Sequence, residues 1–145
     1  MQKILLKNRK ATFDYEILNK FEVGMVLRGH EAKSLRSGGG NLKGSFVSLL
    51  GGEAFIKNFH IPLYEKATLE GYEPERPRKL LLRKAEILKL TSALNTEGVA
   101  LIPLVCGLQS GKIKLVIALA RGKKNYDKRH SIKNREQDRS IREQY

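Results

Sequence analysis

The last 25 residues limit what this chain can fold into, because they hold almost nothing that a core could bury. Residues 121–145 contain nine Lys or Arg, four Asp or Glu, and only four large apolar side chains. So polar a segment cannot offset the entropy cost of ordering itself, and we expect a basic tail that is disordered in the free protein. The fold must therefore be built from residues 1–120.

The tail would nevertheless present a regular surface if it became helical. At about 100° per residue, five of its cations would fall within an arc of roughly 60°. They are Lys124, Lys128, Arg135, Arg139 and Arg142. A single cationic stripe of this kind is suited to a wall of phosphates, so we expect the tail to fold against RNA.

The charge of the whole chain points to the same class of partner. With 28 Lys or Arg against 15 Asp or Glu, the net charge is +13 and the pI is near 10.0. Such a field attracts polyanions, and it favours a nucleic-acid partner over the alternative of an ordinary basic soluble protein. No stretch joins a basic face to a large apolar face, so a membrane surface is the weaker expectation.

Apolar segments and cysteine content predict the compartment. The longest nearly apolar run, residues 99–108, is interrupted by Pro103 and is too short to span a bilayer. The N-terminus lacks the apolar core of a signal peptide. The single cysteine, Cys106, excludes an internal disulfide framework, and its apolar surroundings predict a buried, inert thiol. We therefore expect a cytoplasmic protein.

Short apolar runs separated by glycine turns predict a mainly β fold. The pair Gly51-Gly52 joins two apolar runs, and residues 109–112 join two more, so each connection predicts a hairpin. Residues 13–17 and 21–29 are two further strand candidates, and Gly24 suggests a bulge or bend. Residues 30–37, and the stretch from Arg83 to Gly98, fit helices, whereas residues 80–82 suit either state.

About six short strands in so small a chain favour a closed or partly open antiparallel β-barrel with helices at its periphery. We expect three regions: a basic N-terminal arm (residues 1–12), the barrel body (13–120) and the basic tail (121–145). Residues 62–77, which are polar and rich in proline, should form a surface loop.

Residue patterns that would signal an enzyme or a metal site are missing. His30, His60 and His130 lie on separate segments, and no cluster has metal-ligand spacing. Residues 39–45 and 107–112 resemble phosphate-binding loops but depart from the motif, so we interpret both as turns. The acidic residues Glu22, Glu31, Glu53 and Asp127 have no partner nucleophile. We therefore expect no enzyme activity, no cofactor and no metal.

A basic run surrounds residues 80–82, and it leaves two interpretations open. Its members are Arg76, Arg78, Lys79, Arg83 and Lys84. They could form a solvated rim with packed stems, or they could face RNA. The ten Phe and Tyr residues lack the paired spacing of base-stacking motifs, so recognition of RNA shape and backbone fits better than base readout.

Several motifs occur in a fixed order along the chain: NRKATFDYEI, FEVGMVLRGHEAKSLR, GNLKGSFV, GEAFI, RPRKLLLRKAEI, and ALARGKKNYDKR followed by IKNRE. Together they resemble the SmpB (small protein B) family of bacterial tmRNA-binding proteins. The resemblance implies an oligonucleotide-binding (OB) type β-barrel that binds the transfer-RNA-like region of tmRNA and delivers it to stalled ribosomes in trans-translation. Implied partners are tmRNA, ribosomal RNA of the decoding centre, and elongation factor Tu through tmRNA, with the protein a monomer when free.

The resemblance also implies roles for individual residues. Positions matching those tied to tmRNA binding are Asn8, Arg9, Glu22, Arg36, Leu81 and Lys114. Positions implied to act on the ribosome, with the tail entering the vacant mRNA channel, are Arg121, Lys123, Lys124, Tyr126, Asp127, Lys128, Arg129, Arg135, Arg139 and Arg142.

Several positions depart from the family pattern, among them the glycine run Gly38-Gly39-Gly40, where one or two of the positions are usually not glycine. Tyr126 replaces a usual His, His30 a common Trp, and Phe46 a common Tyr. Tyrosine keeps a π face for stacking but loses the chance of a cation. The alternative to the tmRNA adaptor is a structural ribosomal protein that binds rRNA.

Overall fold

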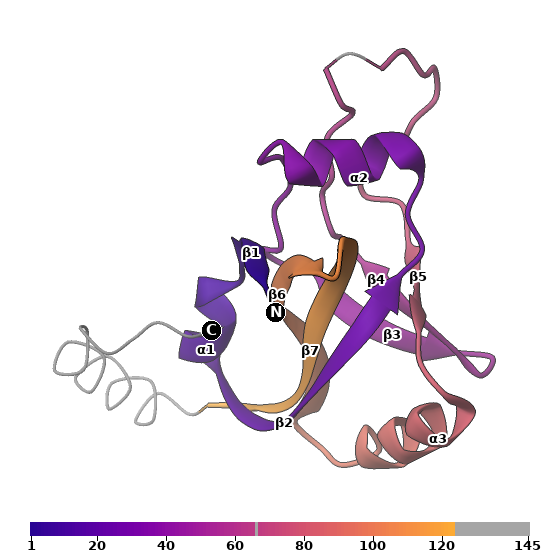
Figure 1. Cartoon of the computed structure of the whole chain (residues 1–145). Coiled ribbons are helices and arrows are strands. Elements are labelled where there is room, and N and C mark those ends of the chain that lie inside the picture. The colour runs from indigo at the N-terminus through magenta and orange to yellow at the C-terminus, as the bar shows by residue number, and fades with distance from the viewer. Residues whose placement is uncertain (66, 124–145) are drawn as a thin grey trace, which may run out of the picture.

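A computed structural model of the chain describes residues 1–65 and 67–123. Within these residues, a single antiparallel sheet of seven strands has the order β1-β6-β7-β2-β5-β4-β3, with three helices around it (Figure 1). The strands are β1 (Lys3–Lys7), β2 (Tyr15–Met25), β3 (Phe46–Leu50), β4 (Glu53–Lys57), β5 (Arg78–Leu81), β6 (Val99–Gln109) and β7 (Lys112–Gly122). The helices are α1 (Arg9–Asp14), α2 (Gly29–Arg36) and α3 (Lys84–Ala93). The prediction of a mainly β, antiparallel fold is confirmed.

Both predicted hairpins are present. Strands β3 and β4 pair from Leu50↔Glu53 outward, and the connecting Gly51 and Gly52 have φ values of 61° and 79°. Two consecutive positive φ values suit glycine, which has no Cβ to clash. Strands β6 and β7 pair over their whole length from the turn at Ser110 and Gly111.

The core lies on both faces of the β6–β7 hairpin. One face contributes Leu101, Leu115 and Ile117 to the main apolar cluster, which also contains side chains of β2, β3, β4, β5 and α2. The other face contributes Val116 and Ala118 to a second cluster that packs against α1. Because both faces are covered, the sequences of these strands are continuous apolar runs rather than alternating ones.

The N-terminal region differs from the expectation. The first residues form β1, which pairs with β6, and α1 follows, so the expected basic arm belongs to the folded sheet. Phe13 lies in α1, and the two strands expected at residues 13–17 and 21–29 are one strand, β2. Its bulge falls between Ile17 and Asn19, not at Gly24. The alternation that suggested a strand at Phe13 is too short to outweigh the packing of α1 against β6 and the second cluster.

The sheet is not closed, so the predicted closed or partly open barrel is not confirmed. The sheet has β1 and β3 at its ends, and no strand pairing joins them within the described residues. Strand β3 lies near β6 without belonging to the same ladder, so the sheet curls but stays open. The described residues therefore form an open antiparallel sheet with peripheral helices.

The two longer helices begin in the same way. The carboxylate of Glu31 accepts the backbone N–H of Arg28 at 2.8 Å, and that of Glu86 accepts the N–H of Arg83 at 2.8 Å. Each thereby satisfies a donor at the helix start that the helix itself leaves unpaired. Residues 80–82, which suited either state, divide between the end of β5 and the turn into α3. Among the residues described, no helix has the length and apolar character needed to cross a membrane.

Candidate nucleic-acid interface

An open groove lies where β2, β5 and β7 meet the start of α3. Its volume is about 540 Å³, and its lining combines two carboxylates, two cations and four small or apolar residues. The lining residues are Glu22, Val23, Gly24, Leu81, Leu82, Arg83, Glu86 and Lys114. Three of the six residues implied to bind tmRNA, Glu22, Leu81 and Lys114, are thus brought together from distant segments of the sequence.

Strand register creates the groove. Gly24 on β2 lies opposite Leu81 on one side and Lys114 on the other. A Cβ at Gly24 would come within 3.2 Å of Leu81 Cδ1, so the absence of a side chain at Gly24 lets Leu81 lie close over β2. Glu22 lies two residues along β2 and therefore faces the same side of the sheet.

The groove offers both charge and an apolar surface. Leu81 is 56% exposed although it is a leucine in a strand, and Glu22 and Arg83 are at least partly exposed beside it. Lysine and arginine can neutralise phosphates, and carboxylates accept hydrogen bonds from base or ribose donors. This combination suits a nucleotide more than a bare phosphate. Sequence reasoning did not identify Leu82 or Glu86, and it placed Arg83 only in the basic run.

Arg36 lies near this site but does not line it. Its guanidinium Nη2 donates to the carbonyl oxygen of Gly111 at 2.9 Å, at the tip of the β6–β7 hairpin. The hairpin strand β7 carries Lys114 three residues further on. The side chain of Arg36 remains exposed, so its contact with Gly111 holds a cation beside β7, which lines the groove.

Asn8 and Arg9 lie elsewhere, at the junction of β1 and α1. The side-chain amide of Asn8 donates to the carbonyl oxygen of Pro103 at 2.9 Å, where the β6–β7 register shifts. Asn8 therefore holds the first segment against the bulge of β6, which is a structural role. Arg9 is exposed at the first position of α1.

Two of the residues expected to act on the ribosome are described, and they lie near α1. Arg121 is exposed near the end of β7, opposite Glu16 of β2. Lys123 follows, where its N–H donates to the carbonyl of Asp14 and its Nζ to that of Thr12 at 3.1 Å. The other eight lie outside the described residues: Lys124, Tyr126, Asp127, Lys128, Arg129, Arg135, Arg139 and Arg142.

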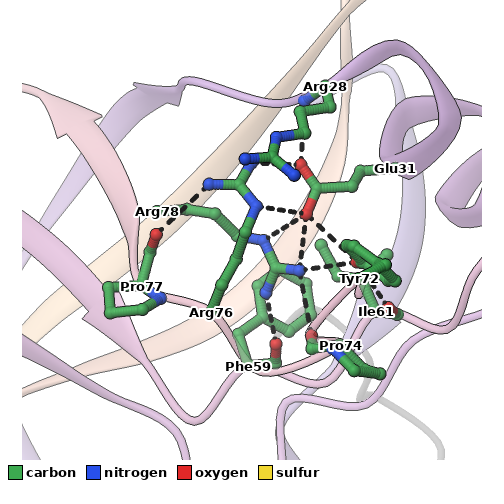
Figure 2. Close-up of polar contacts among 9 residues, drawn as sticks. All are labelled: Arg28, Glu31, Phe59, Ile61, Tyr72, Pro74, Arg76, Pro77 and Arg78. Atoms are coloured by element: carbon green, nitrogen blue, oxygen red, sulfur yellow. Dashed lines mark hydrogen bonds and ion pairs between the residues drawn. The ribbon is translucent and has the colours of Figure 1, made fainter. Parts of the chain in front are cut away.

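A buried ion cluster joins α2 to the loop before β5 (Figure 2). Glu31 and Arg78 are both fully buried, and Arg78 Nη2 and Nε donate to Glu31 Oε2 at 2.6 and 2.8 Å. Arg76 binds the same carboxylate through Nη2 and Nε. Tyr72 donates to the carbonyl of Ile61 at 2.7 Å and accepts from Arg78 at 2.9 Å. The loop of residues 62–77 is thus fixed to α2 by its C-terminal half.

The cluster shifts the acidity of its members. Burial by itself would raise the pKa of Glu31, but hydrogen bonds from Arg76, from the Arg28 backbone and from Arg78 outweigh it and lower the pKa to about 2. Burial raises the pKa of Tyr72. Glu31 is therefore a permanent counter-ion at neutral pH.

For two members of the basic run, neither the solvated rim nor the RNA-facing surface is found. Of the five cations, Arg76 and Arg78 are engaged by Glu31 rather than offered to a phosphate. Arg83 lines the groove, and Lys79 and Lys84 are exposed. The helical spacing of Glu31, Ser34 and Leu35, which share one buried face of α2, was the signal that could have placed Glu31 inside.

The described residues include one cysteine, and its surroundings decide its reactivity. Cys106 is fully buried, and burial raises its pKa to about 12, so its thiol is protonated and inert. Over residues 1–65 and 67–123, no group of three or more His, Cys, Asp or Glu side chains is placed to hold a metal ion.

Known sequences resemble this chain along nearly its whole length. It matches the SmpB protein family over residues 5–145. An SsrA-binding protein from Syntrophobacter fumaroxidans is 49% identical over 139 residues, which cover 96% of this chain and 86% of that protein. An SsrA-binding protein from Desulforudis audaxviator is 46% identical over 140 residues, covering 97% and 92%.

A solved structure resembles it as well. A chain from the structure described as "tmRNA-SmpB: a journey to the center of the bacterial ribosome" shares 41% sequence identity and superposes with a TM-score of 0.69. The match covers 96% of this chain and 98% of that one.

Proposed function

This chain belongs to the SmpB family, and on that premise we propose that it is a non-catalytic RNA-binding adaptor for trans-translation. It binds the transfer-RNA-like domain of tmRNA (SsrA RNA) and delivers it to stalled ribosomes. The observation that carries the proposal is the groove, because the register of three strands places Glu22, Leu81 and Lys114 around one space.

Each groove residue has a distinct role in binding. Lys114 neutralises a phosphate, and Leu81 packs its exposed side chain against a base or ribose. Glu22 accepts hydrogen bonds from base or ribose donors, which a phosphate does not have. Arg36 and Arg9 add positive charge elsewhere on the body, and Asn8 acts indirectly by fixing the segment that carries Arg9.

We propose that the C-terminal residues act on the ribosome instead. The cationic stripe at Lys124, Lys128, Arg135, Arg139 and Arg142 binds ribosomal RNA along the vacant mRNA channel. Tyr126 stacks on a decoding-centre base. Arg121 and Lys123 link this tail to the body, and elongation factor Tu joins through tmRNA. The free protein is a cytoplasmic monomer in this proposal.

Substitutions in the groove test the proposal directly. We expect Leu81→Ala and Lys114→Gln each to weaken binding to a labelled transcript of the transfer-RNA-like domain by about 10-fold, measured by fluorescence anisotropy. Lys89→Gln, on an exposed position of α3 that does not line the groove, is the matched control and should bind normally. Equal affinities for the unchanged protein and all three variants would overturn the assignment.

Sedimentation separates the adaptor from a structural ribosomal protein. An adaptor should be substoichiometric on ribosomes and should copurify with tmRNA. Stoichiometric recovery with salt-washed subunits, without tmRNA, would instead indicate a ribosomal component.

A further inference from the structure

An apolar diagonal runs from the groove across the outer face of the sheet. On β3, β4 and β5 the side chains of Val47, Ala54 and Leu80 are buried in the core. Their neighbours in sequence therefore face outward, because successive side chains of a strand point to opposite faces. Three of these outward residues are apolar: Phe46 (42% exposed), Leu81 (56% exposed) and Phe55, which is partly exposed.

The register sets these three side chains in line. Phe55 pairs with Ser48 of β3 and Lys79 of β5, whereas Phe46 and Leu81 each lie two residues away from those partners. Such diagonal neighbours are about 7–8 Å apart, within reach of aromatic side chains. Phe46, Phe55 and Leu81 thus form a diagonal on adjacent strands that ends at the groove (Figure 1 shows β3, β4 and β5 side by side).

Two lysines lie beside the diagonal, each opposite one of its aromatic rings on the neighbouring strand. Lys57 pairs with Phe46 across β3 and β4, and Lys79 pairs with Phe55 across β4 and β5. Lys79 Nζ lies 3.2 Å from Glu53 Oε1, in an ion pair whose side chains are 46% and 49% exposed. An exposed pair of this kind is weak, so a phosphate can compete with Glu53 for the lysine.

We propose that the diagonal of Phe46, Phe55 and Leu81 is a stacking platform for unpaired RNA bases that follow the nucleotide held in the groove. This inference rests on the proposed function and adds base stacking to it. Aromatic rings with cations beside them on the next strand are suited to single-stranded RNA, because bases stack on the rings while lysines contact the backbone. No regular spacing in the sequence reveals this, since the residues meet only through strand pairing.

RNA fits this face better than a protein partner does. Lys57, Lys79 and Glu53 interrupt the apolar residues, so a partner would bury charges together with the rings. Protein interfaces are depleted of charge at their centres. The platform also continues into the groove without a break, since Leu81 belongs to both.

A tryptophan placed on the diagonal can report stacking, because the chain contains no tryptophan. We expect the emission of Phe46→Trp and of Phe55→Trp to be quenched when a transcript of the transfer-RNA-like domain of tmRNA is added. The control is Leu69→Trp, at a position that is 41% exposed and lies in the loop of residues 62–77. Its emission should not change on binding.

Leucine substitutions test the contribution to affinity. Phe46→Leu and Phe55→Leu keep an apolar side chain but remove the π face, so we expect about 5- to 10-fold weaker binding with an unchanged salt slope. Lys57→Gln should instead reduce the slope of log affinity against log salt by about 0.7–0.9. Thermal unfolding of each variant checks that the sheet is intact.

The outcomes separate this inference from the function on which it rests. Tight binding by the unchanged protein, with normal affinity of both leucine variants and no quenching of either tryptophan, would overturn the platform alone. Loss of ribosome association by the leucine variants with RNA affinity intact would make the face a protein-docking surface and also overturn it. If the unchanged protein did not bind the transcript, both proposals would fall.

Discussion

At the scale of single residues, Glu31 has the most demanding environment among the residues described. Its carboxylate has no exposed surface, and it receives donors from two arginine side chains and one backbone N–H. The arginines come from the loop before β5 and from β5 itself, whereas Glu31 belongs to α2. One carboxylate therefore connects two elements that lie far apart along the chain.

Removing the charge of Glu31 should destabilise the fold strongly. Glu31→Gln leaves Arg78 buried without its counter-ion, and breaking a buried pair in this way costs about 3–5 kcal/mol in the free energy of unfolding. Urea denaturation measures the change. The matched control is Glu75→Gln, because Glu75 is 55% exposed and lies 3.5 Å from His60 at the surface, where the effect should be below about 1 kcal/mol.

The same carboxylate predicts a pH dependence. The pKa of Glu31 in the folded state is about 2, below its ordinary value of 4.5, so its contribution is present above pH 4.5 and is lost as the pH falls towards 2. The shift corresponds to roughly 3 kcal/mol. Urea midpoints of the unchanged protein should therefore fall over this range. The urea midpoint of Glu31→Gln should lack the part of this fall that comes from Glu31. If the midpoints of the two proteins fell in parallel with pH, the assignment would be contradicted.

Residue identity alone could not predict this arrangement. A basic run around residues 80–82 looks uniform, yet Arg78 is fully buried and its neighbour Lys79 is exposed, because they face opposite sides of β5. The surroundings of His30 could not be predicted from its identity either. Its ring meets Tyr72 edge-on with centroids 4.5 Å apart, and neither of its buried nitrogens has a hydrogen-bond partner among the described residues.

At the scale of elements, the groove depends on a glycine in β2, Gly24. Gly24→Val would place a branched side chain between Leu81 and Lys114 and would displace the side chain of Leu81, which lies 3.2 Å from the position of the added Cβ. We expect RNA affinity to fall by at least about 10-fold, with the free energy of unfolding changed by less than about 1 kcal/mol, since valine suits a strand. Fluorescence anisotropy and urea denaturation measure the two quantities.

Gly24→Ala provides a graded comparison. The three atoms nearest to its Cβ all belong to the side chain of Leu81, whose end is flexible, so its affinity should lie between those of the glycine and valine proteins. Normal affinity of the valine variant would show that RNA does not occupy this space.

Elements with strong local signals could be predicted from the sequence, and those that depend on distant pairing could not. The Gly51-Gly52 hairpin, the β6–β7 hairpin and α2 follow from turn chemistry and helix spacing within a few residues. Strand β1 is short and basic, and only β6, about a hundred residues away, makes it a strand. The groove has the same character, because Glu22, Leu81 and Lys114 meet only through the register of three strands.

At the scale of the whole molecule, charge is divided between the body and the residues beyond it. Residues 124–145 contain seven cationic and four acidic residues, so a chain shortened to residues 1–123 keeps a net charge of +10. We expect this shortened protein to bind the transfer-RNA-like domain within about threefold of the full affinity and with steep salt dependence. It should fail to rescue stalled ribosomes in a reconstituted translation assay.

Full-length protein assayed in parallel is the control. Equal loss of RNA binding and of rescue on truncation would show that the two roles are not divided in this way.

The strand order also affects how the chain can fold during its own synthesis. Strand β7, the last of the described strands to be made, lies between β2 and β6. Strand β1, the first to be made, can pair only after β6 has been synthesised. A nascent chain that halts before β7 is complete therefore leaves β2 and β6 without the strand that joins them, with apolar surface open to misassembly. Under the proposed role, a factor that releases halted ribosomes would itself be vulnerable to interrupted translation until β7 has been made.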